Sequence, residues 1–380
     1  KKLSAVARSA FAPGRRGITV LTLVVLAVYL AHGIWAQLMF RTAAYDLSIF
    51  DQAIRAYAHF DKPVVPMKGP DYNIWGDHFH PIIITIAPLY WFFNTPYVLI
   101  VVQALLVAAS VPVVHRFTLR RTEPWFALVV AGVYGLGWPV MTMIDFDFHE
   151  VAFGMPILAL ALDALDRRND RQLLVWAVLL LLVREDMGVI VAVLGFVRLL
   201  QGGRKRLPAL GLMAAGLVTY LLVTSVVIPA FATEGYAYTS QYDALGDSLP
   251  EILVSIVTKP WHALDLLLTP VVKTQTLAYL FLPLALLPLR SPYVLVALPL
   301  LAGRMFNSRE NLWIPMFHYN ALPWLVLVLA TIDGADRFGL FEPGDRARRL
   351  RRVLAAWMVL ATLACTVIPL NHRPRALWEM

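Results

Sequence analysis

Residues 45–81 read YDLSIFDQAIRAYAHFDKPVVPMKGPDYNIWGDHFHP and form the first long polar segment between apolar runs. The segment contains five aspartates and three histidines, namely Asp46, Asp51, Asp61, Asp71, Asp77, His59, His78 and His80. Carboxylates placed where a membrane helix meets water suit proton transfer or cation binding. The segment therefore predicts either the lid and floor of an active site at a membrane surface, or a loop whose acids only keep it solvated.

The composition excludes an ordinary soluble protein. Of the 380 residues, 59% are hydrophobic and 15% are charged, whereas soluble domains carry about 25% charged residues. We expect an all-α integral membrane protein, because a helix pairs its own backbone groups within lipid. The net charge of +8 then belongs in cytoplasmic loops and is no evidence for nucleic acid binding. The single cysteine, Cys365, excludes a disulfide within the chain.

The first apolar run, residues 18–40, is longer than the core of a signal peptide and is predicted to be a retained span. The basic residues before it are Lys1, Lys2, Arg8, Arg15 and Arg16. Because positive charge stays on the cytoplasmic side, we expect a multi-pass protein with a cytoplasmic N-terminus and an external segment 41–81.

We predict one membrane domain with about eleven transmembrane segments, several of them short. Its parts are the first span (18–40), an external loop with interfacial helices (41–81), core spans (82–231), a second, polar external loop (232–270) and C-terminal spans (271–370), all within residues 1–380. In the first loop, Leu47, Phe50 and Ile54 share one side of a predicted helix over residues 46–59. Such a stripe is typical of a helix that lies along the membrane surface.

A charged triplet, Arg184, Glu185 and Asp186, interrupts an apolar stretch near the middle of the chain. Basic clusters flank the stretch, so both ends are expected on the cytoplasmic side, and each arm is shorter than the ~20 residues of a full span. A charge facing hydrocarbon costs roughly 2.5 to 3.5 kcal/mol. We therefore predict a hairpin of two short helices whose charged turn faces protein or water.

The predicted topology separates the charges. Basic clusters fall on the cytoplasmic side, and the acidic and histidine-containing segments gather on the other. Random decoration of loops would not segregate in this way, so we expect one polar cavity at the external face.

Several motifs resemble an uncharacterised family (of the domain-of-unknown-function type) of multi-pass bacterial membrane proteins that is grouped with the glycosyltransferase C (GT-C) superfamily. The motifs are YDLSIFDQA (45–53), GDHFHP (76–81), DFDFHEVAF (145–153), LLVREDMGV (181–189) and FHYNALPW (317–324). The resemblance implies a GT-C-like helical bundle whose first external loop carries a catalytic aspartate. It also implies transfer of a sugar from a polyprenyl-phosphate donor to an envelope glycan or lipid-linked acceptor at the outer face of a bacterial plasma membrane.

Such a transfer needs a carboxylate to accept the proton of the acceptor hydroxyl. Asp46, just past the first span, is the preferred base, and Asp51 and Asp77 are the alternatives. Each aspartate also has a purely structural interpretation. Asp46 and Asp77 are placed to cap helices, and Asp51 is four residues from Arg55, a spacing suited to an ion pair.

The departing lipid phosphate needs cationic or hydrogen-bonding partners. The predicted substrate- and phosphate-binding residues are His78, His80, His149, Arg184, Glu185, Asp186, Arg304, His318 and Tyr319. For the hairpin triplet an internal ion pair is an equal alternative, and Arg304 and its neighbours are also placed to anchor the interface. No cofactor is required by the motifs. A divalent metal is left open, with Asp77, Asp145 and Asp147 as its ligands.

Two other functional classes fit the same residues. A transporter or lipid flippase also needs buried charges and broken helices. A scaffold with a degenerate site would keep the fold without chemistry. Acids confined to one face favour chemistry at that face over passage through the membrane.

Overall fold

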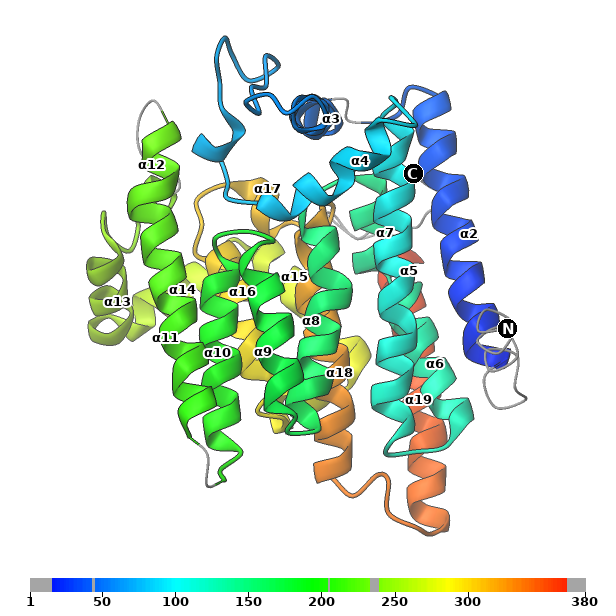
Figure 1. The fold of residues 1–380 in the computed structure, drawn as a ribbon. Helices are drawn as coiled ribbons and strands as arrows, with labels where there is room; N and C mark the ends of the chain where they lie inside the picture. Colours follow the sequence, from blue (N-terminus) through cyan, green and yellow to red (C-terminus); the bar gives the residue numbers. More distant parts are fainter. Residues whose placement is uncertain (1–15, 43–44, 204–205, 233–238, 368–380) are drawn as a thin grey trace.

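The computed structural model of the chain describes residues 16–42, 45–203, 206–232 and 239–367. Within these ranges the protein is helical, apart from an isolated β-bridge between Val64 and Asn73. Most helices run side by side, so their connections gather at two ends (Figure 1). The basic segment at 1–15 and the predicted external tail at 371–380 lie outside the described residues.

The first part of the bundle comprises α2 (Arg16–Leu38), α3 (Tyr45–Ala58), α4 (Ala87–Tyr90), α5 (Tyr97–Leu119), α6 (Pro124–Gly135), α7 (Trp138–Asp145), α8 (Val151–Asp166), α9 (Asp170–Leu181) and α10 (Met187–Leu200). The second part comprises α11 (Leu207–Leu222), α12 (Ile228–Phe231), α13 (Leu249–Thr258), α14 (Pro260–Leu268), α15 (Val271–Phe281), α16 (Val294–Met305), α17 (Glu310–Trp313), the 3₁₀ turn η7 (His318–Asn320), α18 (Ala321–Arg337) and α19 (Asp345–Val367). We call the end crossed by α3 the histidine end. The opposite end, where the α5–α6, α8–α9, α10–α11 and α18–α19 connections lie, is the basic end (Figure 1).

Four helical stretches are long and apolar enough to cross a membrane: Arg16–Leu38, Tyr97–Leu119, Pro124–Asp145 and Leu207–Phe231. The bent pair Pro260–Leu268 and Val271–Leu284, which turns by 78°, would make a fifth. The predicted count of about eleven spans is therefore not reached by these criteria. Several predicted spans form shorter helices instead, among them α8 with 16 residues and α16 with 12.

The interfacial helix predicted over residues 46–59 is present as α3, which lies across the bundle axis at the histidine end (Figure 1). Its apolar stripe, including Leu47, Phe50 and Ile54, is buried against the bundle. On the other side Asp51 receives the Arg55 guanidinium at 2.7 Å, the i,i+4 pairing expected from the sequence. The helix is therefore held flat over the bundle by an amphipathic pattern.

The core is centred on α18, whose residues from Ala321 to Ala335 are all buried. A helix that is apolar on every side belongs inside a bundle rather than at its surface. Trp324 of α18 and Trp138 of α7 are among the largest fully buried side chains. The short helices therefore pack around α18 within the protein.

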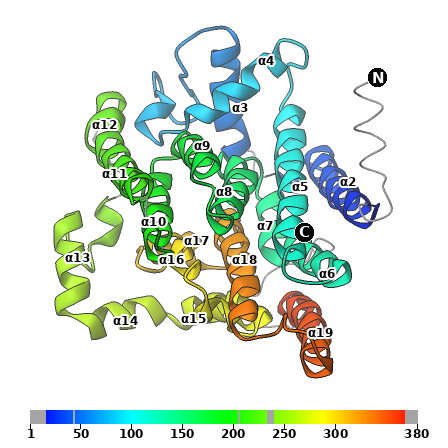
Figure 2. The same ribbon diagram turned by 60° about the horizontal axis from the view of Figure 1, so that its bottom comes forward.

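Within the segment predicted as a second, polar external loop (232–270), residues 249–268 are helical. That part forms α13 and α14, which lie beside the bundle and not above the histidine end (Figures 1 and 2). The two helices expose Leu253, Val254, Val257 and Trp261. Exposed apolar side chains on an amphipathic helix suit contact with lipid, and the aspartates and tyrosines near this segment masked that pattern.

A dense ion-pair network joins three helices at the basic end. Asp163 of α8 is fully buried and accepts hydrogen bonds from Arg116 at 2.7 Å, Arg120 at 2.5 Å and Arg167 at 2.8 Å. Asp166, one turn further, pairs with Arg120 and Arg121 and receives the Tyr293 hydroxyl at 2.9 Å. These contacts fasten α5, α8 and the start of α16 together.

Candidate functional site

The charged triplet forms the turn between α9 and α10, as the hairpin prediction requires. The Arg184 guanidinium donates from Nε and Nη2 to the two carboxylate oxygens of Asp186, at 2.9 and 2.6 Å. Its Nη1 donates to Glu150 Oε1 at 3.2 Å. The Glu150 side chain is 4% exposed and that of Asp186 is 39% exposed. Arg184 is thus paired with a buried carboxylate, that of Glu150, and with a solvent-facing carboxylate, that of Asp186.

Glu185 faces the polar loop after α3. Its Oε1 lies 2.7 Å from His78 Nδ1, and its Oε2 accepts the backbone N–H of Phe79 at 3.1 Å. Burial alone would lower the pKa of His78, but the Glu185 carboxylate outweighs it and raises the pKa to about 9. At neutral pH, His78 is therefore an imidazolium paired with a carboxylate.

A close backbone approach places this loop. The turn at Ile74–Gly76 packs against the end of α12, and a Cβ on Gly76 would lie 2.6 Å from the Phe231 carbonyl oxygen. Only glycine fits there without displacing backbone atoms. The residues that follow, from 77 to 81, are consequently held over the α9–α10 turn.

The segment between α7 and α8 is fixed by one amide in the apolar helix α5. Gln103 donates to the carbonyl oxygens of Met143 at 3.2 Å and Asp147 at 2.8 Å, and it accepts the backbone N–H of His149 at 3.0 Å. Buried polar groups are costly unless they are paired, so this arrangement holds the segment in one conformation. It presents His149 and Glu150 toward the histidine end.

His149 stacks on His318 of η7, with ring centroids 3.8 Å apart and planes inclined by 23°. Phe146 packs beside both rings at 5.3 Å. Burial lowers the pKa of both His149 and His318. Two imidazolium ions at this distance would repel each other strongly. The stacked pair is therefore neutral and does not supply cations for a phosphate.

Three buried imidazoles have a ring nitrogen without a hydrogen-bond partner. The Nδ1 atoms of His80, His149 and His318 have no hydrogen bond within the described ranges. Burial lowers the pKa of His80 as well. A buried polar atom left unpaired costs free energy, so such atoms mark places where a ligand or a water belongs.

Asp46 lies in the first turn of α3, and its side chain is 29% exposed. Its Oδ1 is 4.0 Å from His149 Nε2, too long for a direct hydrogen bond. Asp46 is thus a partly exposed carboxylate at the rim of the cluster, next to a neutral imidazole.

The contacts form a closed circuit through four segments of the chain. From Asp46 the circuit passes to His149 and Glu150, then to Arg184 and Glu185, then to His78 and His80, and returns through Phe50 of α3, which lies 5.7 Å from both the His80 and His149 rings. We call these residues, with Asp186 and the stacked His318, the histidine-end cluster. Most of the predicted site residues therefore meet in one place.

Other predicted residues have structural partners. Asp51 is bound to Arg55 and receives the Tyr90 hydroxyl at 2.9 Å, which makes it a fastening between α3 and α4. Asp77 pairs with Lys68 within the same loop. Neither alternative base is placed as openly as Asp46.

The Arg304 guanidinium, a predicted phosphate contact, is engaged by protein groups in this structure. The guanidinium donates to the carbonyl oxygens of Leu312 at 2.7 Å and Tyr319 at 2.9 Å and to Asn320 Oδ1 at 3.0 Å. Every arm of the fork is used, so Arg304 clamps the 312–320 segment onto α16. Tyr319 serves the same clamp through its carbonyl oxygen, and its ring lies 4.0 Å from that of His318.

The proposed metal ligands are not brought together. Asp145 Oδ1 lies 3.0 Å from His32 Nε2 of α2, whereas Asp77 belongs to the Lys68 pair and Asp147 lies in the segment held by Gln103. In the part of the chain that the structure describes, no group of three or more potential ligands is arranged around a common metal position. We therefore assign no step to a metal.

Three members or supports of the cluster were not among the predicted site residues: Glu150, Gln103 and Phe50. Gln103 carried a signal, because a lone amide inside a 23-residue apolar helix needs a buried partner. Glu150 adjoins the predicted His149, but its pairing with Arg184 spans 34 residues. Phe50 looked like one more member of an apolar stripe.

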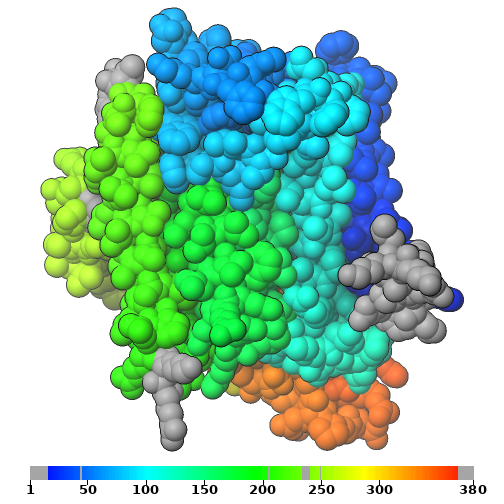
Figure 3. Space-filling model, viewed as in Figure 1, coloured from blue at the N-terminus to red at the C-terminus, as the bar shows by residue number. Residues whose placement is uncertain are grey.

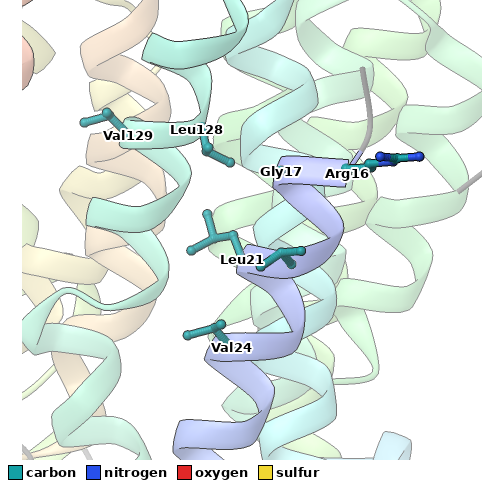
Figure 4. A pocket seen from close by; sticks show the side chains of 7 residues that line it. Arg16, Gly17, Leu21, Val24, Leu128 and Val129 are labelled. Atoms are coloured by element: carbon teal, nitrogen blue, oxygen red, sulfur yellow. The ribbon is translucent and has the colours of Figure 1, made fainter. Parts of the chain in front are cut away.

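An apolar cavity of about 560 Å³ lies elsewhere, between α2 and α6. Figure 4 shows Leu21, Val24 and Leu128 lining it, with Arg16 at one end. Its walls are those of a lipid-facing crevice near the basic end. It is not the polar cavity predicted for the external face.

No curated protein matches the sequence. A family model described as "Predicted membrane protein (DUF2079)" matches residues 37–377. The match includes α3, the 77–81 loop, the α9–α10 turn and η7, and hence every member of the histidine-end cluster. It agrees with the four helices of membrane-spanning length and composition. The chain belongs to the DUF2079 family of predicted membrane proteins.

Proposed function

We propose that this protein is a membrane glycosyltransferase of GT-C-like architecture that uses a polyprenyl-phosphate-linked sugar at the extracytoplasmic face. One observation carries the proposal: a partly exposed carboxylate, Asp46, shares a single cluster with a largely buried arginine and an imidazolium. A transferase of this kind needs a proton acceptor on one side of the sugar and cations on the other.

In the proposed reaction, Asp46 accepts the proton of the acceptor hydroxyl. The hydroxyl oxygen forms a bond to the anomeric carbon as the bond from that carbon to the donor phosphate oxygen breaks. The products are the glycosylated acceptor, a polyprenyl phosphate and a protonated Asp46, which returns its proton to solvent. The charge that develops on the leaving phosphate is met by Arg184 and His78.

The two carboxylates bound to Arg184 differ in exposure, and in the proposal this difference lets a phosphate reach the guanidinium. Asp186 occupies Nε and Nη2 from the solvent side, and this fork geometry also fits two phosphate oxygens. In the proposal, phosphate displaces the exposed Asp186 while buried Glu150 keeps the guanidinium in place. His149 and His318 remain neutral and form a wall beside Asp46.

The decisive experiment uses purified protein in vesicles with a panel of polyprenyl-phosphate-linked hexoses and pentoses, and it measures release of polyprenyl phosphate. Asp46→Asn should lower turnover by about 10²- to 10⁴-fold, the usual contribution of a general base, without changing expression. Asp61→Asn is the matched control, because Asp61 is exposed and lies just after the same helix.

Wild-type turnover in the Asp46→Asn variant would remove Asp46 from its role. The rival function, a transporter or flippase, predicts a different result from the same vesicles. The wild-type protein would then move a labelled lipid or solute across the bilayer while the sugar–phosphate bond stays intact. That outcome would contradict the transferase proposal.

A further inference from the structure

The start of α19 gathers arginines that no acidic residue neutralises. Arg346, Arg349 and Arg352 are exposed, and no ion pair is found for them among the residues described here. Arg348, between them, pairs with Asp345 at 3.4 Å. Three unneutralised guanidinium groups within seven residues repel one another unless an anion lies among them.

The same helix face continues as an apolar stripe. Val353, Trp357 and Leu360 follow Arg346 and Arg349 at intervals of three to four residues, which places all five on one side of α19. Val353 is 65% exposed and Leu360 is 66% exposed. Guanidinium groups at the end of the molecule thus lead directly into exposed apolar side chains.

Hydrogen bonds to other parts of the chain hold this end of α19 in place. Arg351, on the opposite side of the helix, donates to Glu123 at 2.8 Å and to the Leu340 carbonyl oxygen at 2.7 Å. Trp357 Nε1 donates to the Leu282 carbonyl oxygen at 2.7 Å. In the space-filling view the α18–α19 connection projects from the basic end, with its surface open (Figure 3).

We infer that this face of α19 binds one anionic phospholipid, with its phosphate among Arg346, Arg349 and Arg352 and an acyl chain along Val353, Trp357 and Leu360. The positive-inside rule explains basic residues at this end in general. It does not explain why three of them share one helix with no acid to neutralise them. Exposed arginines also lie elsewhere at the basic end, such as Arg171 of α9 and Arg206 just before α11.

Trp357 offers a local reporter, because a bromine atom on an acyl chain quenches tryptophan fluorescence on contact. The protein is placed in phosphatidylcholine vesicles that contain either tail-brominated phosphatidylglycerol or tail-brominated phosphatidylcholine. The contribution of Trp357 is obtained by subtracting the signal of a Trp357→Phe variant. We expect stronger quenching by the anionic lipid at the same mole fraction.

Replacing Arg346, Arg349 and Arg352 with Gln should abolish that preference, since each arginine near an anionic surface contributes about fivefold in affinity. A triple Lys variant keeps the charge and should retain most of the preference, which separates lost binding from lost folding. The matched control removes the same charge from exposed arginines of the same end: Arg168, Arg171 and Arg206.

A wild-type protein that shows no preference for the anionic lipid would overturn the inference. So would an equal loss of preference in the control triple, because that result would mean that only the overall surface charge matters. This inference does not depend on the proposed transferase activity, and neither measurement uses the sugar donor.

Discussion

Charged residues are concentrated at both ends of the bundle, but their hydrogen-bonding groups are satisfied to different extents. At the basic end, both oxygens of Asp163 and of Asp166 accept hydrogen bonds from arginines, and nothing of those carboxylates is left for a ligand. At the histidine end, the buried Nδ1 atoms of His80 and His318 have no hydrogen-bond partner in the part of the chain that the structure describes, and the Asp46 side chain is partly exposed. A saturated network fastens helices, whereas an unsaturated one has capacity for a substrate.

The largest effect should appear where the network is saturated. Asp163→Ala leaves three arginines facing a buried gap and should lower the free energy of unfolding by about 3–5 kcal/mol. Chemical unfolding in detergent micelles measures this loss. Asp345→Ala serves as the control, since Asp345 is exposed and should leave the unfolding curve in place. If Asp163→Ala instead reduced turnover per folded molecule, the basic end would also be part of the site.

The His78–Glu185 pair should give an intermediate effect with a definite pH dependence. The pKa of His78 rises from 6.5 to about 9 on folding. Its contribution is therefore complete below about pH 6.5 and is lost as the pH rises through about 9. A charge-assisted hydrogen bond is worth about 1.5–3 kcal/mol. Thermal unfolding of the wild type should show this decline between those pH values.

Glu185→Gln removes the carboxylate that holds the proton on His78. The variant should be less stable at pH 6.5 and should show little further decline toward pH 9. A decline as steep as that of the wild type would show that another group titrates and that the pair is not the cause.

The smallest effect on stability should come from the stacked pair. His318→Phe keeps an aromatic ring against His149 and Phe146 and removes the unpartnered Nδ1, so the free energy of unfolding should change by less than about 1 kcal/mol. If that nitrogen contacts substrate, turnover should fall by about tenfold, the equivalent of one hydrogen bond. Unchanged turnover would show that the His149–His318 pair contributes packing only. The contrast between the two ends of the bundle would then have less support.

Part of the fold could be predicted because it depends on local patterns. The stripe of Leu47, Phe50 and Ile54 was sufficient to place α3, and the cost of a charged triplet facing hydrocarbon was sufficient to place the turn between α9 and α10. The helices α13 and α14 were missed because scattered polar residues obscured an amphipathic period. The number of spans could not be fixed from the sequence, because short apolar segments look alike whether they cross lipid or pack inside protein.

The candidate site, like the fold, could be predicted only in part. The sequence placed histidines and acids at one end, but it could not assign partners to them. Glu185 and His78 are separated by 107 residues, and only the packing of the 77–81 loop on the hairpin brings them together. The partners of Arg304 could not be predicted, because the backbone carbonyl oxygens that accept its hydrogen bonds carry no sequence signal.

The short arms of the hairpin have a consequence for the surrounding bilayer. With 12 residues in α9 and 14 in α10, the arms rise about 18–21 Å, well short of a hydrocarbon layer of about 30 Å. If the basic end sits at one membrane surface, polar atoms around Arg184 lie at a depth where lipid tails would otherwise be, so the bilayer must thin there. Turnover should therefore be higher in vesicles of short-chain lipids than in those of long-chain lipids. Turnover that is indifferent to chain length would mean that protein alone surrounds the hairpin.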